Sequence, residues 1–267
     1  MTEQKRVGSK SIKDIPPHIR EQLNHGEIET ANLVEFLSID GKVLVQTVLE
    51  QFQRCQYLPQ IITRINNLEV KTHTTVHGVI TSELAQQITL HQDWELKQKI
   101  STHPADIVRC WGAVIVALDL RNNIQTTLTQ MWPFAEDRHF NVREVAWSVL
   151  RSRIIEHLDE AISILSVWAI HDHENIRRFA SEATRPRGVC VTHIKELKNN
   201  PEKALSILEP LKADLSPYVQ TSVGNWLNDA SKSRPDFVLH LCSQWEKESN
   251  TRATKLIIKK ALRTLHK

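Results

Sequence analysis

Apolar residues recur through most of this chain at intervals of three and four positions, the spacing that places side chains on one side of an α-helix. Pro16 and Pro17 open the first such pattern, which continues through HIREQLN. Further helices are expected near residues 28–38, 41–54, 58–66 and 72–89. No apolar run approaches the roughly 18 residues that a membrane span requires, so we expect no contact with a membrane.

The second half of the chain repeats itself from residue 104 onward. Three tripeptides recur at a spacing of 34 residues, and each opens a helical pattern that follows a shorter one: Ile107-Val108-Arg109, Asn141-Val142-Arg143 and Asn175-Ile176-Arg177. In the same register, Gln220 lies 43 residues after Arg177, and Thr254 lies 34 residues after Gln220. The third residue after each of these positions is small or apolar, which predicts a column of buried side chains: Gly112, Ala146, Ala180, Val223 and Ile257.

Helix pairs repeated at this interval are typical of an α-solenoid built from HEAT-like or armadillo-like repeats. One pair cannot bury its own apolar face, so neighbouring pairs stack and their second helices are expected to line a concave face. We therefore expect an all-α fold with a single repeat domain over residues 16–267, preceded by a flexible basic arm over residues 1–15. The 43-residue interval is nine residues longer than the others, which predicts an insertion beside RPRGVCVTH, on the rim of the concave face.

The composition limits the functions that such a scaffold could serve. With 34 Lys and Arg against 31 Asp and Glu the chain is only mildly basic, so nucleic-acid binding would require cations gathered on one surface. Four widely spaced cysteines without a CxxC pair suit a reducing compartment and argue against structural zinc. The sequence has no glycine-rich phosphate loop, GxSxG, HExxH or Cys/His cluster, so we expect neither a metal nor a cofactor. The charged N-terminus resembles no secretory signal, which predicts a protein that is not secreted.

Carboxylates and tryptophans stand among cations on the predicted second helices. If the helix that starts at Glu174 continues toward Pro186, then Arg178, Glu182 and Arg185 share one face at i, i+4 and i+7. Arg187 and Trp168 flank this grouping in the sequence. Two other repeats carry similar groupings, which consist of Arg143, Glu144 and Trp147 in one and of Asn225, Asp229 and Lys232 along one face in the other. Each residue alone has a simple structural explanation, an ion pair or a core position. Their combination on aligned helices favours a ligand site.

A carboxylate in a cationic groove suits one particular kind of chemistry. It can stabilise positive charge that develops on a sugar, while arginines hold the neighbouring phosphates. Aromatic faces can stack on or clasp a cationic base. Such a site suits cleavage of a base that alkylation has already made positive, because that leaving group needs little protonation. The hypothesis requires Glu182 and Asp229, which are 47 positions apart, to share one cationic surface.

At these residues the chain resembles the AlkC/AlkD superfamily of alkylpurine DNA glycosylases, which are built from HEAT-like repeats. The resemblance rests on RRFASEATRPR (177–187) and SVGNWLNDASKSRPDFV (222–238), and WEKESNTRATKLIIKKALRTL looks like the closing repeat of the family. It covers about residues 104–265 in motif detail. The RRxxSExxRPR signature is closer to the AlkC branch.

The resemblance implies that the protein binds double-stranded DNA as a monomer and hydrolyses the N-glycosidic bond of N3-alkylated bases of the 3-methyladenine type. It further implies a cytoplasmic, nucleoid-associated location. Carried over by motif, Glu182 and Asp229 match the catalytic carboxylates of the AlkC type, and a third acidic position maps onto Glu144. The residues expected to bind DNA are Arg143, Arg178, Arg185, Arg187, Lys232, Trp147 and Trp168.

One departure from the family pattern leaves a second function open. The family segment continues RPRLPW with a tryptophan at the lesion site, whereas this chain reads RPRGVC and has Cys190 at that position. The alternative is a repeat protein that binds damaged or branched DNA without excising a base. The basic run from Arg252 to Lys267 is open to two interpretations as well, a solvated cap of the array or a surface for a phosphate backbone.

Overall fold

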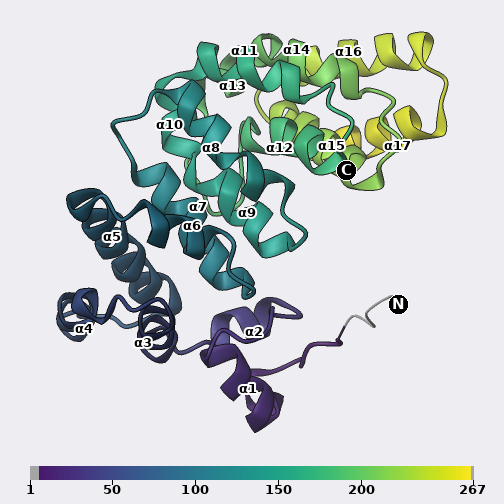
Figure 1. Ribbon diagram of the computed structural model, residues 1–267. Helices are drawn as coiled ribbons and strands as arrows, with labels where there is room; N and C mark the ends of the chain where they lie inside the picture. The colour runs from purple at the N-terminus through teal and green to yellow at the C-terminus, as the bar shows by residue number, and fades with distance from the viewer. Residues whose placement is uncertain (1–5, 266–267) are drawn as a thin grey trace. The chain divides into compact units, whose positions relative to one another are not determined.

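Every regular element over residues 6–265, the part of the chain that the computed structural model describes, is a helix (Figure 1). This confirms the predicted all-α class. Over the same residues, no helix combines the length and apolarity needed to cross a bilayer. The chain divides into two compact units, one made of the residues up to Leu120 together with His139–Val145, the other of Arg121–Arg138 and the residues from Ala146 onward. The single domain expected over 16–267 stays a prediction, and each unit is described by itself.

The first unit contains the helices that the apolar spacing predicts. Its core gathers large aliphatic side chains from α3, α4 and α5 around Trp111 of α7, and these are almost completely buried. The observed bounds lie close to the expected ones: α1 Pro17–Asn24, α2 Leu33–Ser38, α3 Gly41–Gln51, α4 Leu58–Asn66, α5 His73–His91, α6 Trp94–Ser101 and α7 Asp106–Leu118.

One helix start in this unit differs from expectation. Helix α2 begins at Leu33 instead of near residue 28, because the Asn32 side chain accepts a hydrogen bond from the Glu35 amide and so caps the helix. In the segment 6–15, Arg6 forms a bidentate ion pair with Glu35, at 2.6 and 2.7 Å, and Ile15 is buried; the flexible arm expected over residues 1–15 stays a prediction. Residues 1–5 of the expected arm lie outside the described residues.

The second unit consists of the stacked helix pairs. Helix α9 (Phe140–Val149) contributes its second half to this unit. The other helices, with short 3-10 turns at 201–204, 209–211 and 262–264, are α8 Ile124–Glu136, α10 Arg151–Glu156, α11 Leu158–Trp168, α12 Glu174–Ala183, α13 Lys195–Asn199, α14 Leu205–Leu208, α15 Pro217–Ser231, α16 Pro235–Glu248 and α17 Arg252–Ala261.

The predicted repeat register agrees with the observed helices. Each motif-bearing helix begins two or three residues before its aligned position, and these helices are α7, α9, α12, α15 and α17. The residue of each helix in the predicted column, from Gly112 to Ile257, is buried. Within the second unit, α12 packs on α15 and α15 packs on α17, so three second helices lie side by side. The extra residues between α12 and α15 form a loop over 184–194 and the short helix α13, which places the predicted insertion directly after α12.

Candidate active site

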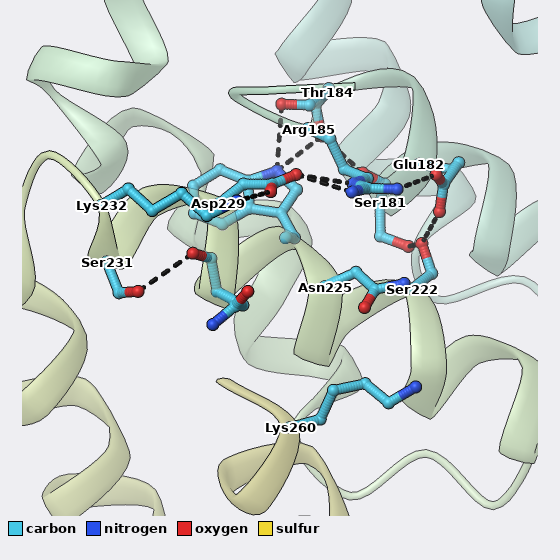
Figure 2. Close-up of polar contacts among 12 residues, drawn as sticks. Ser181, Glu182, Thr184, Arg185, Ser222, Asn225, Asp229, Ser231, Lys232 and Lys260 are labelled. Atoms are coloured by element: carbon cyan, nitrogen blue, oxygen red, sulfur yellow. Dashed lines mark hydrogen bonds and ion pairs between the residues drawn. The ribbon is translucent and has the colours of Figure 1, made fainter. Parts of the chain in front are cut away.

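A single guanidinium joins the two acidic residues that the sequence singled out (Figure 2). Arg185 donates from Nη1 to Glu182 Oε1 at 2.6 Å. It also donates from Nε and Nη2 to Asp229 Oδ2, at 2.9 and 2.7 Å. Glu182 comes from α12 and Asp229 from α15, so the packing of these helices brings two carboxylates, distant in sequence, to one cation.

Arg185 does not lie on the helix face where the i, i+4, i+7 spacing predicted it. Helix α12 ends at Ala183, and Arg185 follows it in the loop. The cause is Pro186, which disfavours the α conformation of the residue before it. Leaving the helix lets the Arg185 side chain lie between α12 and α15. The prediction of one continuous face is therefore wrong for Arg185, although its expected pairing with Glu182 is present.

The second oxygen of Glu182 is bound from α15 and approached from its own helix. Ser222 donates to Glu182 Oε2 at 2.6 Å and accepts a hydrogen bond from Ser181 at 2.8 Å. Arg178 Nη2 lies 3.5 Å from the same oxygen, and its guanidinium covers the Tyr218 ring at 4.6 Å from the centroid. Glu182 is 4% exposed, so protein groups take up most of its hydrogen-bonding capacity.

The two oxygens of Asp229 differ in how firmly they are held. Oδ2 receives both hydrogen bonds from Arg185, whereas Oδ1 is paired with Lys232 Nζ at 3.2 Å. Asp229 itself is 3% exposed, but the Lys232 side chain is 42% exposed. A solvent-exposed lysine pair contributes little free energy, so Oδ1 is the carboxylate oxygen most easily released.

The cations keep Glu182 ionised. Burial by itself raises the pKa of this carboxyl, but Arg178, Arg185 and the hydrogen bond from Ser222 together bring the pKa below its usual value. Burial likewise lowers the pKa of Arg185, and the two carboxylates outweigh it and raise that pKa. The centre therefore holds its charges at neutral pH.

Arg151, which the sequence reading missed, clamps the loop that carries Arg185. Its side chain is 2% exposed and donates to the carbonyls of Ala183 (2.8 Å), Thr192 (2.9 Å) and Arg185. The first of these carbonyls belongs to the last turn of α12, where carbonyls lack a helical partner. Burial and the neighbouring Arg185 lower the pKa of Arg151 to about 10, which leaves it cationic at neutral pH. No spacing rule points to a contact that depends on the path of a loop.

The remainder of the insertion loop is anchored at three further points. The Ile194 amide donates to the Pro186 carbonyl at 3.1 Å, and Arg187 Nη2 donates to Ser233 Oγ at 2.6 Å. Gly188 lies so close to the Trp147 ring that an added Cβ would be 3.5 Å from it. Cys190 is exposed and adopts a left-handed backbone conformation, with φ of 58°.

The two tryptophans predicted to bind DNA lie in the interior. Trp168 is 6% exposed, and its ring packs against Trp132 and Phe179 with centroids 4.7 and 5.2 Å apart. Trp147 is 5% exposed and lies beneath the loop at Gly188. In this structure both rings are packing residues, and neither presents a face on which a base could stack.

Arg143 and Glu144 lie in the first unit, on the part of α9 that precedes Ala146, and both are half-buried. The structure thus groups Glu182, Asp229, Arg178, Arg185 and Lys232 in one centre of the second unit. Within residues 6–265, no group of three or more His, Cys, Asp or Glu side chains could hold a metal ion.

Ser222 was a second omission of the sequence reading, although a signal for it existed. Ser222, Asn225 and Asp229 lie at i, i+3 and i+7, so they share the face of α15 on which Asp229 had already been singled out.

Comparison with known proteins gives one family and several similar structures. Residues 113–265 match the family described as DNA alkylation repair enzyme. The uncharacterized protein YhaZ of Bacillus subtilis (strain 168) is 42% identical over 109 residues, which are 41% of this chain and 30% of that protein. This chain therefore aligns with less than a third of that relative.

Three solved structures have similar folds. One is the alkylpurine DNA glycosylase AlkC of Pseudomonas fluorescens, bound to DNA that contains an abasic site analog. The match covers 97% of this chain and 66% of the AlkC chain, with a TM-score of 0.66 and 24% identity. AlkD2 of Streptococcus mutans matches over 78% and 97%, with a TM-score of 0.55 and 22% identity. Smu.31 of Streptococcus mutans UA159 matches over 83% and 98%, with a TM-score of 0.55 and 21% identity. At these identities the likeness concerns the fold.

Proposed function

Because the chain belongs to the family of DNA alkylation repair enzymes, we propose that it is a DNA glycosylase. Its substrate would be duplex DNA that carries a cationic N3-alkylated base of the 3-methyladenine type. The reaction is hydrolysis of the N-glycosidic bond, which leaves the free base and an abasic sugar.

The observation that carries the proposal is the pair of carboxylates, Glu182 and Asp229, held by one guanidinium among further cations. Negative charge placed in a largely desolvated centre can stabilise an oxocarbenium-like transition state strongly, because little solvent screens it. The surrounding Arg178, Arg185, Arg187 and Lys232 would attract the phosphates on either side of the lesion. Paired acids surrounded by cations thus match both the sugar and the backbone of the proposed substrate.

The chemical steps balance without a cofactor. As the C1′–N bond of the alkylated nucleotide breaks, the electron pair goes to the base, which leaves neutral. The sugar becomes positively charged at C1′, and Asp229 would stabilise that charge. A water oxygen then bonds to C1′ and its proton passes through a carboxylate to solvent. No acid needs to protonate the base, because alkylation has already supplied the positive charge.

Both carboxylates are almost completely buried, so the binding of DNA must free one of their oxygens to face the sugar. Among residues 6–265, Asp229 Oδ1 is paired through the exposed Lys232, whereas Oδ2 is held twice by Arg185. In the proposed mechanism a DNA phosphate takes Lys232 from Oδ1, which frees that oxygen to face C1′. Glu182 stays bound to Arg185 and Ser222 and keeps the guanidinium in place.

The direct test is release of methylated base from alkylated duplex DNA under single-turnover conditions. We expect Asp229→Asn to lower the rate by about 10²- to 10³-fold, the usual cost of losing one preorganised electrostatic group. Lys232→Gln should weaken DNA binding but leave the single-turnover rate at saturating protein unchanged or higher, since it frees Oδ1. Melting curves of both variants check that they fold. Equal base release by wild type and Asp229→Asn would reject the catalytic assignment.

One observation favours a second function. Cys190 stands where the resembling family has a tryptophan, and the two nearest predicted aromatic contacts, Trp147 and Trp168, are buried. A protein without an exposed ring at the lesion would bind DNA through its cations alone. That alternative predicts salt-dependent DNA binding, weakened by Arg187→Ala, with no base released from methylated DNA.

A further inference from the structure

A cleft of about 460 Å³ lies between α15 and α17, apart from the carboxylate pair. Its walls are Gln220 and Thr221 near the start of α15, Leu256, Lys259 and Lys260 on α17, and Arg263 in the turn that follows. Three cationic side chains, an amide and a hydroxyl stand among its lining residues, most of the lining surface is apolar, and no carboxylate is among these residues.

Close helix packing fixes the shape of this cleft. Gly224 lets α17 approach α15 so closely that an added Cβ would lie 2.8 Å from Lys260 Cβ. The aliphatic stem of Lys260 thus rests on α15 next to the cleft, and Figure 2 shows its side chain extended beside Asn225. Arg263 Nη1 donates to Asn225 Oδ1 at 3.0 Å and to the Lys260 carbonyl at 3.2 Å, which holds the guanidinium at the rim.

The charge of the cleft is not neutralised within the described residues. Over residues 6–265 the ammonium groups of Lys259 and Lys260 have no ion pair, whereas other lysines of this unit, Lys203 and Lys212, pair with carboxylates. The cleft lies beside the start of α15 and the end of α17, whose dipoles oppose each other there, so its positive charge comes from the three cationic side chains.

We propose that this cleft binds a phosphate of the DNA backbone, at a position several nucleotides from the base that is excised. The proposal deepens the glycosylase assignment and rests on it for the identity of the ligand. Lys259 and Lys260 would neutralise the phosphate, Thr221 would donate a hydrogen bond to it, and Arg263 would bind at the edge.

The length of α15 gives the distance between the cleft and the carboxylate pair. Eight residues separate Thr221 from Asp229, which is about 12 Å along the helix axis at 1.5 Å per residue. A strand of B-DNA advances about 3.4 Å per nucleotide along its axis, so the same span corresponds to roughly three to four nucleotides. A duplex with its lesion at Asp229 that follows α15 would bring a phosphate of that step to the cleft.

The first test measures affinity for an undamaged duplex as a function of salt. Each lost phosphate contact lowers the slope of log Kobs against log[salt] by about 0.9. We expect the double variant Lys259→Gln, Lys260→Gln, which keeps the aliphatic stems, to reduce the slope by about 1 to 2. Lys255→Gln is the matched control, because Lys255 is exposed on the same helix but does not line the cleft. A double variant with the slope of the wild type would overturn the proposal.

The second test locates the phosphate and separates DNA from an acidic protein partner. Single neutral methylphosphonates are placed along a duplex that contains an abasic-site analogue. Wild type should lose affinity when the substitution lies about three to four nucleotides from the lesion, and the double variant should be insensitive there. If no position distinguishes the two proteins while polyglutamate binds wild type but not the double variant, the cleft serves an acidic partner and the proposal fails. Neither readout requires base release, so failure of the glycosylase assignment is seen separately.

Discussion

Arg151 illustrates how one buried side chain can determine the geometry of charged groups that it does not itself bind. Its guanidinium ties the end of α12, the Arg185 backbone and the return of the loop at Thr192 to one another. Because Arg185 in turn holds Glu182 and Asp229, displacement of the loop would separate the two carboxylates.

We predict that Arg151→Gln lowers the single-turnover excision rate by at least tenfold while DNA affinity changes little. The removed cation acts electrostatically on Glu182, whose charge in turn raises the Arg151 pKa, so its loss raises the pKa of the Glu182 carboxyl. The acid limb of the pH–rate profile should therefore move to higher pH. Arg151→Lys, which keeps the charge, should restore the limb but not the full rate. An unshifted limb in Arg151→Gln would limit Arg151 to a structural role.

The residues of the centre were only partly predictable from sequence. Glu182 and Asp229 could be singled out because charged residues at helical spacing are visible in the chain. The position of Arg185 beyond the helix end and the Arg151 clamp depend on the path of the insertion loop, which no periodicity encodes. A core position was one of the two interpretations of Trp147 and Trp168, and the sequence alone could not decide between them, since a tryptophan at the edge of an amphipathic pattern suits both core and surface; both are buried.

At the scale of helices, the contact between α15 and α17 depends on the absence of a side chain at Gly224. An added methyl group would meet the stem of Lys260 at 2.8 to 3.0 Å, close to the α17 backbone, so the helices would have to separate.

We predict that Gly224→Ala destabilises the protein by about 1 to 3 kcal/mol, despite the gain in helix propensity of about 1 kcal/mol. Gly78 on α5 is the matched control: it is exposed, and an added Cβ there has no neighbour within 4 Å. Gly78→Ala should stabilise the protein by about 0.5 to 1 kcal/mol. Denaturant titrations of both variants give the values. Stabilisation by both substitutions would show that the α15–α17 contact is not tight.

Helix positions followed from the sequence more reliably than helix ends. The repeat register, with its 34-residue and 43-residue intervals, located α7, α9, α12, α15 and α17, because a buried column must recur at the same place in each stacked repeat. The start of α2 was misplaced because a side-chain cap at Asn32, and not the apolar pattern, decides where that helix begins. The boundary between the two units lies inside α9, where the apolar rhythm continues without a break.

At the scale of the whole molecule, the first unit contains buried neutral histidines. Burial, with a contribution from His73, lowers the pKa of His77 to about 3, and burial lowers that of His103 to about 4. His77 Nδ1 accepts a hydrogen bond from Trp111 at 3.0 Å, which a protonated ring could not do. The unfolded chain therefore binds more protons than the folded one between these values and about pH 6.5.

We predict that stability falls as the pH is lowered from 6.5 toward 4. The sign follows from linkage: where the unfolded state binds more protons, stability increases with pH. The contribution of His77 alone should be roughly 2 kcal/mol between pH 6.5 and pH 5. Thermal melts of His77→Gln should show a weaker pH dependence than wild type. His240→Gln, a substitution at an exposed site, should show the same pH dependence as wild type. Identical pH dependence of wild type and His77→Gln would contradict this account.

The central claim is that two carboxylates held by one arginine promote excision of a base that already carries positive charge. It is tested most directly by incubating the protein with duplex DNA containing either N3-methyladenine, which is cationic, or O6-methylguanine, which is neutral, and measuring the free base released. We expect release of N3-methyladenine that Asp229→Asn slows by about 10²- to 10³-fold, and no release of O6-methylguanine, whose departure would require protonation. Failure of the wild-type protein to release N3-methyladenine, or equal release of both bases, would contradict the account.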